Sequence, residues 1–225
     1  MTSATRERRL VFLIDVDNTL IDNDRIVADL KAALTAAIGA EREQRYWAVF
    51  EDLRAELGYA DYLGTLQRLR LEDSRDPGLF TISPFLLNYP FAERLFPGAL
   101  ELIGHLNRVG HAVILSDGDA VFQPLKIDRS GLHAAVSGQI LLYVHKEHEL
   151  DDIQRRCPAD HYVLIDDKVR ILAAIKSAWG ARVTTVFPRQ GHYAHDPDVA
   201  TYLPPDVTVE HIGDLLQLDT RSWTS

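Results

Sequence analysis

Two aspartates, Asp15 and Asp17, follow directly on the apolar run Leu10–Ile14. The run has the length and the residue types of a buried strand, so the two carboxylates should lie where that strand ends. Carboxylates this close repel each other, and burial beside an apolar core adds to the cost. A bound divalent cation would offset both effects. The pair therefore predicts a metal site in which one of the acids carries out chemistry.

Three more segments place polar side chains at the ends of predicted strands. They are Ser116 after the run 111–115, Lys146 after a weaker pattern near 134–144, and Asp166 with Asp167 after the run 161–165. The pattern near 134–144 is weaker because Gly138 interrupts it. Ligands of open α/β sheets bind at the carboxyl ends of the strands, so the four segments should meet on one rim. Each motif alone is common, but the four in this order are a specific signal.

The elements that position this rim form an α/β pattern. A fourth apolar run covers 182–187, and helical periods cover 99–109 and 169–179, each followed by a glycine. Buried strands that alternate with helices are typical of a parallel sheet with helices on both faces. The sequence therefore predicts a three-layer, Rossmann-like core.

Residues 22–88 have helical periods and no convincing strand. Polar residues at 22–24 can cap a helix that runs through Ile38, and Tyr46, Phe50, Leu53 and Leu57 follow one helical face. The segment is too long for a simple crossover. We expect an all-helical cap domain at 22–88, inserted into a core domain of residues 1–21 and 89–225. Tyr46 and its neighbour Trp47 could face a substrate or pack in the interior of the cap.

Composition restricts the class of protein. The 225 residues fit one large domain with an insertion, and the net charge of −9 argues against general binding to nucleic acid or an anionic membrane. The single cysteine, Cys157, permits no internal disulfide, which suits the cytoplasm. No apolar stretch approaches the roughly 18 residues of a membrane span. The N-terminus lacks a signal-peptide core, and its arginines, Arg6, Arg8 and Arg9, are expected to form a solvated tail.

The sequence contains nine histidines, and some of them could be metal ligands. Two pairs are spaced three residues apart: His145 with His148, and His192 with His195. No cysteines or acids converge around them in the sequence pattern. Surface or structural roles are therefore expected rather than a zinc site.

The four motifs together resemble the haloacid dehalogenase superfamily, in its phosphatase branch with a helical cap after the first strand. The matching segments are Asp15-Val-Asp-Asn-Thr19, Ile114-Leu-Ser116, Lys146 and Ile165-Asp-Asp167. The resemblance covers about 10–187 in layout, and it is specific at the motifs but not in the cap.

The resemblance implies a reaction mechanism and a set of roles. Asp15 would attack phosphorus and form an aspartyl-phosphate. Asp17 would protonate the leaving oxygen and later accept a proton from water. Ser116 would bind a phosphoryl oxygen, and Lys146 would neutralise charge on the phosphoryl group and on Asp15. Thr19 would support the loop after Asp17.

The same resemblance implies a Mg²⁺ site. Its protein ligands would be the Asp15 carboxylate, the Asp17 backbone carbonyl and a carboxylate from the fourth motif. Asp167 is expected to be the direct ligand, and Asp166 to act through water or by orienting Lys146.

Phosphate binding would involve Ser116, Asp117, Gly118 and Lys146, but the chain departs from the family here. Asp117 adds a negative charge where the family often has a neutral residue, so it should turn away or pair with a base. Gly118 would allow close approach of the backbone to phosphate, or would be an ordinary turn glycine. Glu147 follows Lys146 in place of a frequent proline.

These features predict a Mg²⁺-dependent phosphatase for a small phosphorylated metabolite, with no nucleic-acid or membrane partner and an oligomeric state that the sequence does not give. A phosphosugar mutase would use the same intermediate. A phospho-aspartate receiver domain shares the acids and the lysine, but the helical insertion and the Asp-x-Asp spacing speak against it. A catalytically silent scaffold is disfavoured by the complete motif set. Carbon–halogen hydrolysis is disfavoured because Asp17 would have no task.

Overall fold

The computed structural model describes residues 9–75 and 77–219. Arg6 and Arg8 of the expected tail lie outside this part of the chain, and Arg9 is exposed. Among the helices of the described residues, none combines the length and apolar character needed to cross a bilayer.

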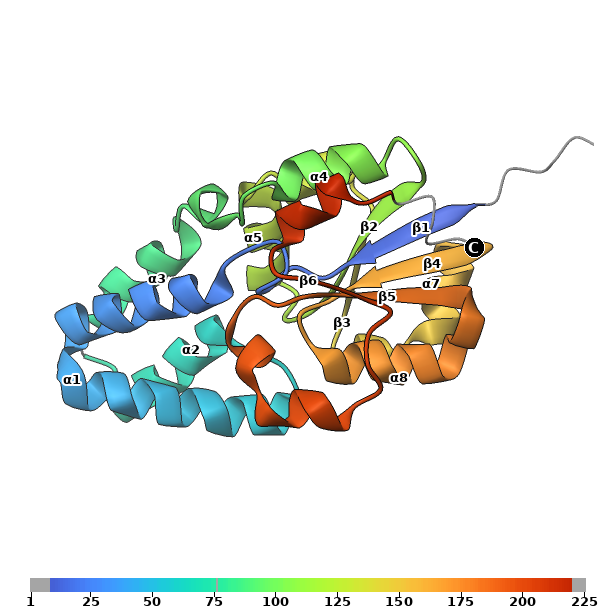
Figure 1. Ribbon diagram of the computed structural model, residues 1–225. Helices are drawn as coiled ribbons and strands as arrows, with labels where there is room; N and C mark the ends of the chain where they lie inside the picture. Colours follow the sequence, from blue (N-terminus) through green and yellow to red (C-terminus); the bar gives the residue numbers. More distant parts are fainter. Residues whose placement is uncertain (1–8, 76, 220–225) are drawn as a thin grey trace, which may run out of the picture.

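A six-stranded parallel sheet forms the centre of the molecule (Figure 1). The strands are β1 Leu10–Ile14, β2 His111–Asp117, β3 Ile140–Tyr143, β4 His161–Ile165, β5 Val183–Pro188 and β6 Val207–Val209. Their order across the sheet is β3-β2-β1-β4-β5-β6, and every neighbouring pair is parallel. β1 lies between β2 and β4, so Leu13 is paired with Val113 on one side and with Leu164 on the other.

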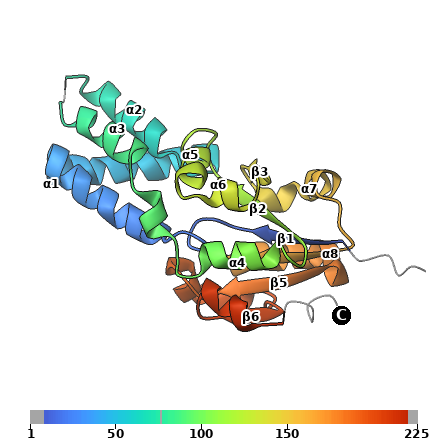
Figure 2. The ribbon, with the colours of Figure 1, turned by 90° about the horizontal axis from the view of Figure 1, so that it is seen from above.

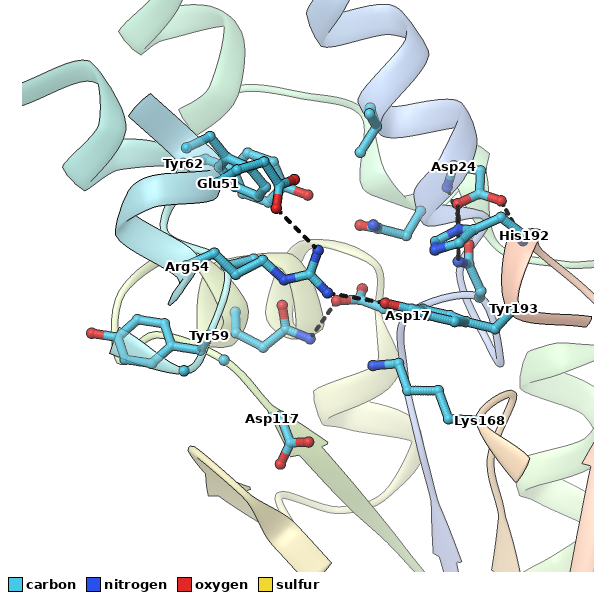
Figure 3. A pocket seen from close by; sticks show the side chains of 18 of the residues that line it. Asp17, Asp24, Glu51, Arg54, Tyr59, Tyr62, Asp117, Lys168, His192 and Tyr193 are labelled. Carbon is cyan, nitrogen blue, oxygen red and sulfur yellow. Dashed lines mark hydrogen bonds and ion pairs between the residues drawn. The ribbon is translucent and has the colours of Figure 1, made fainter. Parts of the chain in front are cut away.

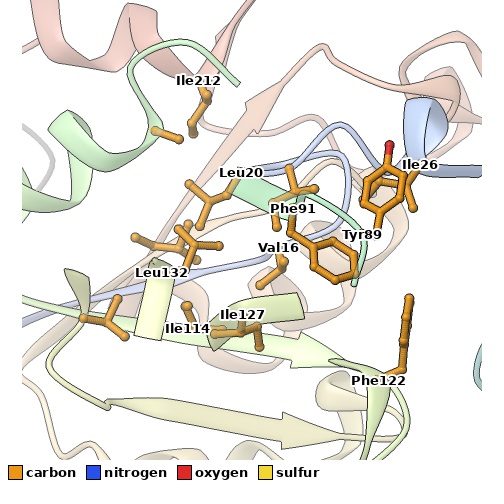
Figure 4. Close-up of a cluster of buried hydrophobic side chains, with 14 of the residues drawn as sticks. Val16, Leu20, Ile26, Tyr89, Phe91, Ile114, Phe122, Ile127, Leu132 and Ile212 are labelled. Atoms are coloured by element: carbon orange, nitrogen blue, oxygen red, sulfur yellow. The ribbon is translucent and has the colours of Figure 1, made fainter. Parts of the chain in front are cut away.

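Helices cover both faces of the sheet, as the apolar runs predicted. The helices of the core are α4 Ala99–Leu106, α5 Phe122–Arg129, α6 Leu132–Ala135, α7 Leu150–Arg156 and α8 Val169–Trp179. Phe12 and Ile14 belong to a cluster with residues of α4, α5 and α6, part of which is drawn in Figure 4. Val11 and Leu13 belong to a second cluster with residues of α7 and α8. Successive side chains of a strand point to opposite faces, so this division identifies a three-layer core.

Three helices between β1 and β2 form the cap, at the end of the molecule beyond the tips of the strands (Figures 1 and 2). They are α1 Asn23–Leu57, α2 Tyr62–Glu72 and α3 Leu79–Leu87. The carboxylate of Asp22 caps α1 by accepting a hydrogen bond from the Arg25 N–H, at 2.9 Å. Gly39 divides α1 into two helical segments, since its φ of 80° and ψ of 163° are not helical.

The chain enters and leaves the cap through two short segments that lie side by side, which we call the neck (residues 20–22 and 94–96). Ile21 and Leu95 form an antiparallel bridge. The Asp22 N–H donates to the Arg94 carbonyl at 2.8 Å, and the Phe96 N–H to the Leu20 carbonyl at 2.9 Å. By these contacts the return to the core lies at 94–96, a few residues after the end of the proposed cap, 22–88; the proposed core comprises 1–21 and 89–225.

Several boundaries differ from the sequence-based expectations. The strand expected near 134–144 is restricted to Ile140–Tyr143, because Ser137 and Gly138 adopt positive φ values of 51° and 75° and form a turn. The helix expected at 99–109 ends at Leu106, and a turn leads from there to Gly110. β6 is a short strand that the sequence pattern did not predict. The described part of the chain also contains short 3₁₀ helices: η1 Phe91–Arg94, η2 Lys146–His148, η3 Gly180–Arg182, η4 His192–His195, η5 Pro197–Thr201 and η6 Ile212–Gln217.

Candidate active site

The parallel sheet brings the ends of β1, β2, β3 and β4 to one rim, where all four motifs meet. Asp15 follows β1 directly, and its N–H donates to the carbonyl of Ile165, the last residue of β4, at 2.9 Å. This bond places Asp15 beside Asp166. Ser116 lies within β2 rather than after it, paired with Leu142 of β3.

Lys146 is the cationic centre of this rim. Its side chain is 1% exposed, and its Nζ lies 2.5 Å from Asp15 Oδ1 and 2.7 Å from Asp166 Oδ2. It also donates to the Leu115 carbonyl at 3.3 Å. Burial alone would lower the pKa of Lys146, but the charges of Asp15, Asp166 and Asp117 raise it well above its ordinary value. The ammonium is therefore held in its charged form against the carboxylate of Asp15.

Asp15, Asp166 and Asp167 form a cluster of buried carboxylates. One oxygen from each lies within 4.8 Å of the other two. Asp15 Oδ2 and both carboxylate oxygens of Asp167 have no hydrogen-bond partner and are shielded from solvent. Unpartnered buried oxygens are costly, and hard divalent cations prefer such ligands. The donor set therefore fits a divalent cation, and in residues 9–75 and 77–219 it is the one group of histidine, cysteine and acidic side chains with metal-binding spacing.

The pKa values of Asp166 and Asp167 are both raised, mainly because both carboxyl groups are buried. Burial raises the pKa of Asp166 to about 6, although the charge of Lys146 opposes the shift. Burial and the charges of Asp15 and Asp166 raise the pKa of Asp167 well above its ordinary value. Asp167 has fewer compensating contacts than Asp166, because Asp166 also accepts a bond from the Lys168 N–H at 2.8 Å. Asp166 is thus held by Lys146 and a backbone N–H, whereas the carboxylate oxygens of Asp167 are without a hydrogen-bond partner.

Thr19 makes a side-chain hydrogen bond to the fourth motif rather than to its own loop. Its Oγ1 accepts from the Asp167 N–H at 3.1 Å. The carbonyls of Asn18 and Thr19 accept from Gln190 Nε2 at 3.2 and 3.0 Å. The loop after Asp17 is therefore fixed to residues that follow β4 and β5.

Asp17 lies apart from the three buried carboxylates, with its side chain 31% exposed. Its Oδ1 accepts from Lys126 Nζ at 2.6 Å, and its Oδ2 from Gln123 Nε2 at 3.3 Å. Both partners lie on α5 and were not predicted from the sequence. Gln123 and Lys126 are three residues apart on the buried face of this helix, beside Phe122 and Ile127. A lysine on an otherwise apolar helical face is the signal that could have found them.

Of the expected phosphate-binding residues, Ser116 is connected to Asp17 through Gln123. Ser116 Oγ accepts from Gln123 Nε2 at 3.0 Å and donates to the Asp117 carbonyl at 3.3 Å. The Asp117 carboxylate accepts from the Lys146 N–H at 2.8 Å, and burial raises its pKa against the opposing charge of Lys146. The hydrogen bond to Asp117 thus comes from the backbone of Lys146, whereas the Lys146 ammonium pairs with Asp15 and Asp166, and Asp117 lines the cavity described below. A Cβ on Gly118 would lie 2.9 Å from Gln123 Cβ, so close packing already requires glycine there.

A cavity of about 800 Å³ opens between the cap and this rim (Figure 3). Its core wall includes Asp17, Asp117, Gly118, Lys168 and His192, and its cap wall includes Trp47, Arg54 and Tyr62. The cap and the core also touch directly, since Arg54 donates to the Tyr193 hydroxyl at 3.0 Å. The ammonium of Lys168 lies 5.0 Å from the centre of the Tyr193 ring. Lys168 was not anticipated from the sequence.

Of the two neighbouring aromatic residues on α1, Trp47 faces the cavity and Tyr46 packs in the interior. Tyr46 is fully buried, and its hydroxyl donates to the Tyr62 carbonyl at 3.0 Å. His145 and His192 also line the cavity, and His192 Nδ1 lies 2.6 Å from Asp24 Oδ1. Cys157 is a buried free thiol.

Comparison with known proteins agrees with this geometry. The chain is 57% identical to a haloacid dehalogenase-like hydrolase from Burkholderia xenovorans LB400, with a TM-score of 0.90 over 97% of this chain and 99% of that one. The magnesium-bound hydrolase YfnB of Bacillus subtilis shares 15% identity, with a TM-score of 0.61 over 94% and 98%. The L-2-haloacid dehalogenase of Xanthobacter autotrophicus shares 17%, with a TM-score of 0.56 over 95% and 98%. The last two show likeness of fold alone.

None of the curated proteins matched the chain. The family model for haloacid dehalogenase-like hydrolases matches residues 10–179, which include the four motifs and the cap. The chain therefore belongs to the haloacid dehalogenase-like hydrolase family.

Proposed function

We propose that this hydrolase is a Mg²⁺-dependent phosphatase that acts on a small phosphorylated metabolite through an aspartyl-phosphate. One observation carries the proposal: the rim pairs a buried carboxylate, Asp15, with a second acid, Asp17, that faces the cavity. Asp15 can act as a nucleophile, and Asp17 can donate a proton to a leaving oxygen. Hydrolysis of a phosphate ester needs both tasks.

In the first step, an oxygen of Asp15 attacks phosphorus and the bond from phosphorus to the leaving oxygen breaks. Asp17 supplies the proton that the leaving oxygen takes. Lys146, 2.5 Å from Asp15, reduces the repulsion between the carboxylate and an anionic phosphoryl group. We assign Ser116 to a phosphoryl oxygen, since its hydroxyl makes only a 3.3 Å donor bond to a carbonyl and can reorient.

In the second step, a water molecule attacks the phosphorus of the aspartyl-phosphate. Asp17 accepts the proton of that water, and the acyl-phosphate bond breaks to release inorganic phosphate and the Asp15 carboxylate. Asp17 thereby returns to its protonated form, and the cycle balances. Positioning and charge stabilisation supply most of the rate acceleration in phosphoryl transfer.

The unpartnered oxygens of Asp15 and Asp167 would hold the Mg²⁺ ion, and Asp17 would contribute its backbone carbonyl. A cation bound there supplies positive charge against the phosphoryl oxygens during transfer. Asp166 would keep Lys146 in place through their 2.7 Å ion pair.

Dehalogenation is the second candidate, because the solved structures of similar fold include L-2-haloacid dehalogenases. Halide leaves without a proton, so that reaction gives Asp17 no task. In this chain Asp17 faces the cavity and has two dedicated partners on α5. That arrangement favours the phosphatase. A phosphosugar mutase would use the same residues and differs only in the fate of the phosphoryl group.

The test is turnover with a panel of phosphorylated compounds. The panel includes p-nitrophenyl phosphate, sugar phosphates, nucleotides and small phosphorylated acids, each with Mg²⁺ and with EDTA. Phosphate release that EDTA abolishes and Mg²⁺ restores supports the proposal. Halide release from 2-chloropropionate, without phosphatase activity, would replace it with the dehalogenase. Isomerised sugar phosphate without net phosphate release would indicate a mutase.

Replacement of Asp15 tests the covalent step directly. Asp15→Asn is expected to lower kcat at least about 1000-fold, because the amide cannot form the aspartyl-phosphate. Circular dichroism should show an unchanged fold. The control is Asp152→Asn, which alters an acid on α7 that pairs with Arg155 outside the cavity and should retain wild-type turnover. Substantial activity in Asp15→Asn would refute the covalent route.

A further inference from the structure

Lys126 is a buried lysine with no role in the mechanism proposed above. It lies on α5, and its side chain is 1% exposed. Burial of an ammonium is costly unless a carboxylate and further polar groups compensate it. Here the carboxylate is Asp17, with Asp17 Oδ1 2.6 Å from Lys126 Nζ. The buried charge of Lys126 is therefore directed at the proposed acid–base residue.

Two further contacts define the position of the Asp17 carboxylate. Gln123, one helical turn before Lys126, donates to the other carboxylate oxygen of Asp17 at 3.3 Å. The same amide donates to Ser116 Oγ at 3.0 Å. One face of α5 thus holds both oxygens of Asp17 and connects them to the second motif.

Lys126 also reaches the cap. Its Nζ donates to Asn23 Oδ1 at 3.1 Å, and Asn23 is the first residue of α1. A single ammonium therefore joins the core helix α5, the loop after β1 and the start of the cap.

We propose that Lys126 is a positioning residue for acid–base catalysis: together with Gln123 it holds the Asp17 carboxylate in the place from which it reaches the leaving oxygen. The inference rests on the proposed phosphatase function. It predicts that loss of Lys126 matters most where the leaving oxygen needs a proton.

The test is a series of phosphate esters whose leaving groups differ in basicity. The ratio kcat/KM covers the steps up to departure of the leaving group, so it isolates the step in which Asp17 donates. A p-nitrophenolate ion leaves without a proton, whereas an alkoxide needs one. Lys126→Met should lower kcat/KM about 100-fold for alkyl phosphates, within the range of general acid catalysis, and less than about 10-fold for p-nitrophenyl phosphate.

An equal loss across the series would assign Lys126 a purely structural role and overturn the proposal. Lys126→Arg keeps the cation and should recover part of the rate with alkyl phosphates. The matched control is Lys176→Met, which removes a partly buried lysine paired with Asp206 at 2.7 Å and should leave the wild-type dependence on the leaving group.

A double variant tests whether Lys126 acts through Asp17. In the Asp17→Asn background, Lys126→Met should change kcat/KM for alkyl phosphates by no more than about 3-fold, because the residue on which it acts is already lost. Losses that multiply would mean that the two side chains act independently, and would overturn the proposal.

A crystal structure of Lys126→Met provides a readout that does not depend on turnover. The Asp17 carboxylate should leave its present position beside α5. An unchanged position would contradict the proposal even if the wild type hydrolyses no phosphate ester. Absence of turnover in the wild type would contradict the proposed function instead, so the two failures are distinguishable.

Discussion

The two acids that follow β4 are adjacent in sequence but have different surroundings. Asp166 faces Lys146 and accepts a backbone N–H, whereas both carboxylate oxygens of Asp167 are buried without a partner. An uncompensated buried carboxylate destabilises the folded state until something neutralises it. If Asp167 binds the proposed Mg²⁺, it does so at the expense of the stability of the metal-free protein.

Asp167→Asn should therefore stabilise the metal-free protein, by about 1–3 kcal/mol, because the amide has similar size and no charge to bury. In EDTA the variant should melt several degrees above the wild type. Addition of Mg²⁺ should raise the Tm of the wild type and leave that of the variant nearly unchanged. Thermal unfolding followed by circular dichroism measures both effects.

Asp206→Asn is the matched control, with the opposite sign. Asp206 accepts from the Thr185 N–H at 2.8 Å and pairs with Lys176 at 2.7 Å. Burial raises the pKa of Asp206, but the bonds from Lys176 and Thr185 outweigh it and leave the pKa below its ordinary value. Loss of this charge should lower the Tm, and the response to Mg²⁺ should persist. A lower Tm for Asp167→Asn in EDTA would contradict the argument.

Residue types at strand ends were enough to predict Asp15, Lys146, Asp166 and Asp167 as one cluster, since the parallel sheet dictates where strand ends meet. Lys126 and Gln123 could not be placed in the same way. They reach Asp17 from the side of a helix, and their contacts depend on how α5 packs against the loop after β1. That packing is a tertiary property that no local spacing specifies.

At the scale of elements, the break in α1 is the clearest local feature of the cap. Gly39 has φ 80° and ψ 163°, a conformation that only glycine adopts readily. A Cβ there would meet no atom within 4 Å, so backbone strain alone opposes a side chain. The caps and periods of 22–57 predicted helix on both sides of this glycine but not the bend. The bend lets the two segments follow different directions while α1 packs against both α2 and α3.

Gly39→Ala should destabilise the protein by about 1–3 kcal/mol, the usual cost of a residue held in a sparsely populated backbone conformation. Gly104→Ala is the matched control. Gly104 lies inside α4, a Cβ there also meets no atom within 4 Å, and alanine favours a helix by about 1 kcal/mol. Urea unfolding should move the two midpoints in opposite directions. A stabilised Gly39→Ala would mean that α1 can straighten without loss.

The short strand β6 could not be predicted from the sequence pattern. Only Val207–Val209 form it, and the run is bounded by polar residues. Three residues carry too little periodicity for recognition, and the strand exists because β5 offers an unpaired edge beside it. The same reasoning applies to β3, where the turn at Ser137 and Gly138 removes half of the apparent pattern.

At the scale of the whole molecule, the cavity between the cap and the core is lined from both sides. The carboxylates and Lys146 belong to the core, whereas Trp47, Arg54 and Tyr62 approach from the cap. Under the proposed function, chemistry and selectivity would come from different parts of the chain. The sequence could not tell which cap side chains face the cavity, because that depends on the orientation of α1.

Trp47→Ala should change substrate preference. Among the phosphorylated compounds of the panel, kcat/KM for the preferred one should fall at least about 10-fold relative to p-nitrophenyl phosphate, since the indole lines the cavity outside the reacting group. Tyr46→Phe is the control: it removes a buried hydrogen bond worth about 1 kcal/mol and should lower the Tm without altering preference. Parallel losses on all substrates would make Trp47 a structural residue.

The neck of the cap has a consequence for how relatives of this chain can diversify. The two segments that cross it are hydrogen-bonded to each other, at 2.8 and 2.9 Å, so the ends of the intervening stretch already meet. A longer, shorter or unrelated stretch with the same two ends could be grafted there without reordering a single strand. Exchange of one contiguous piece of the gene could therefore change the side chains that line the cavity from the cap, while the buried carboxylates and Lys146 stay in place.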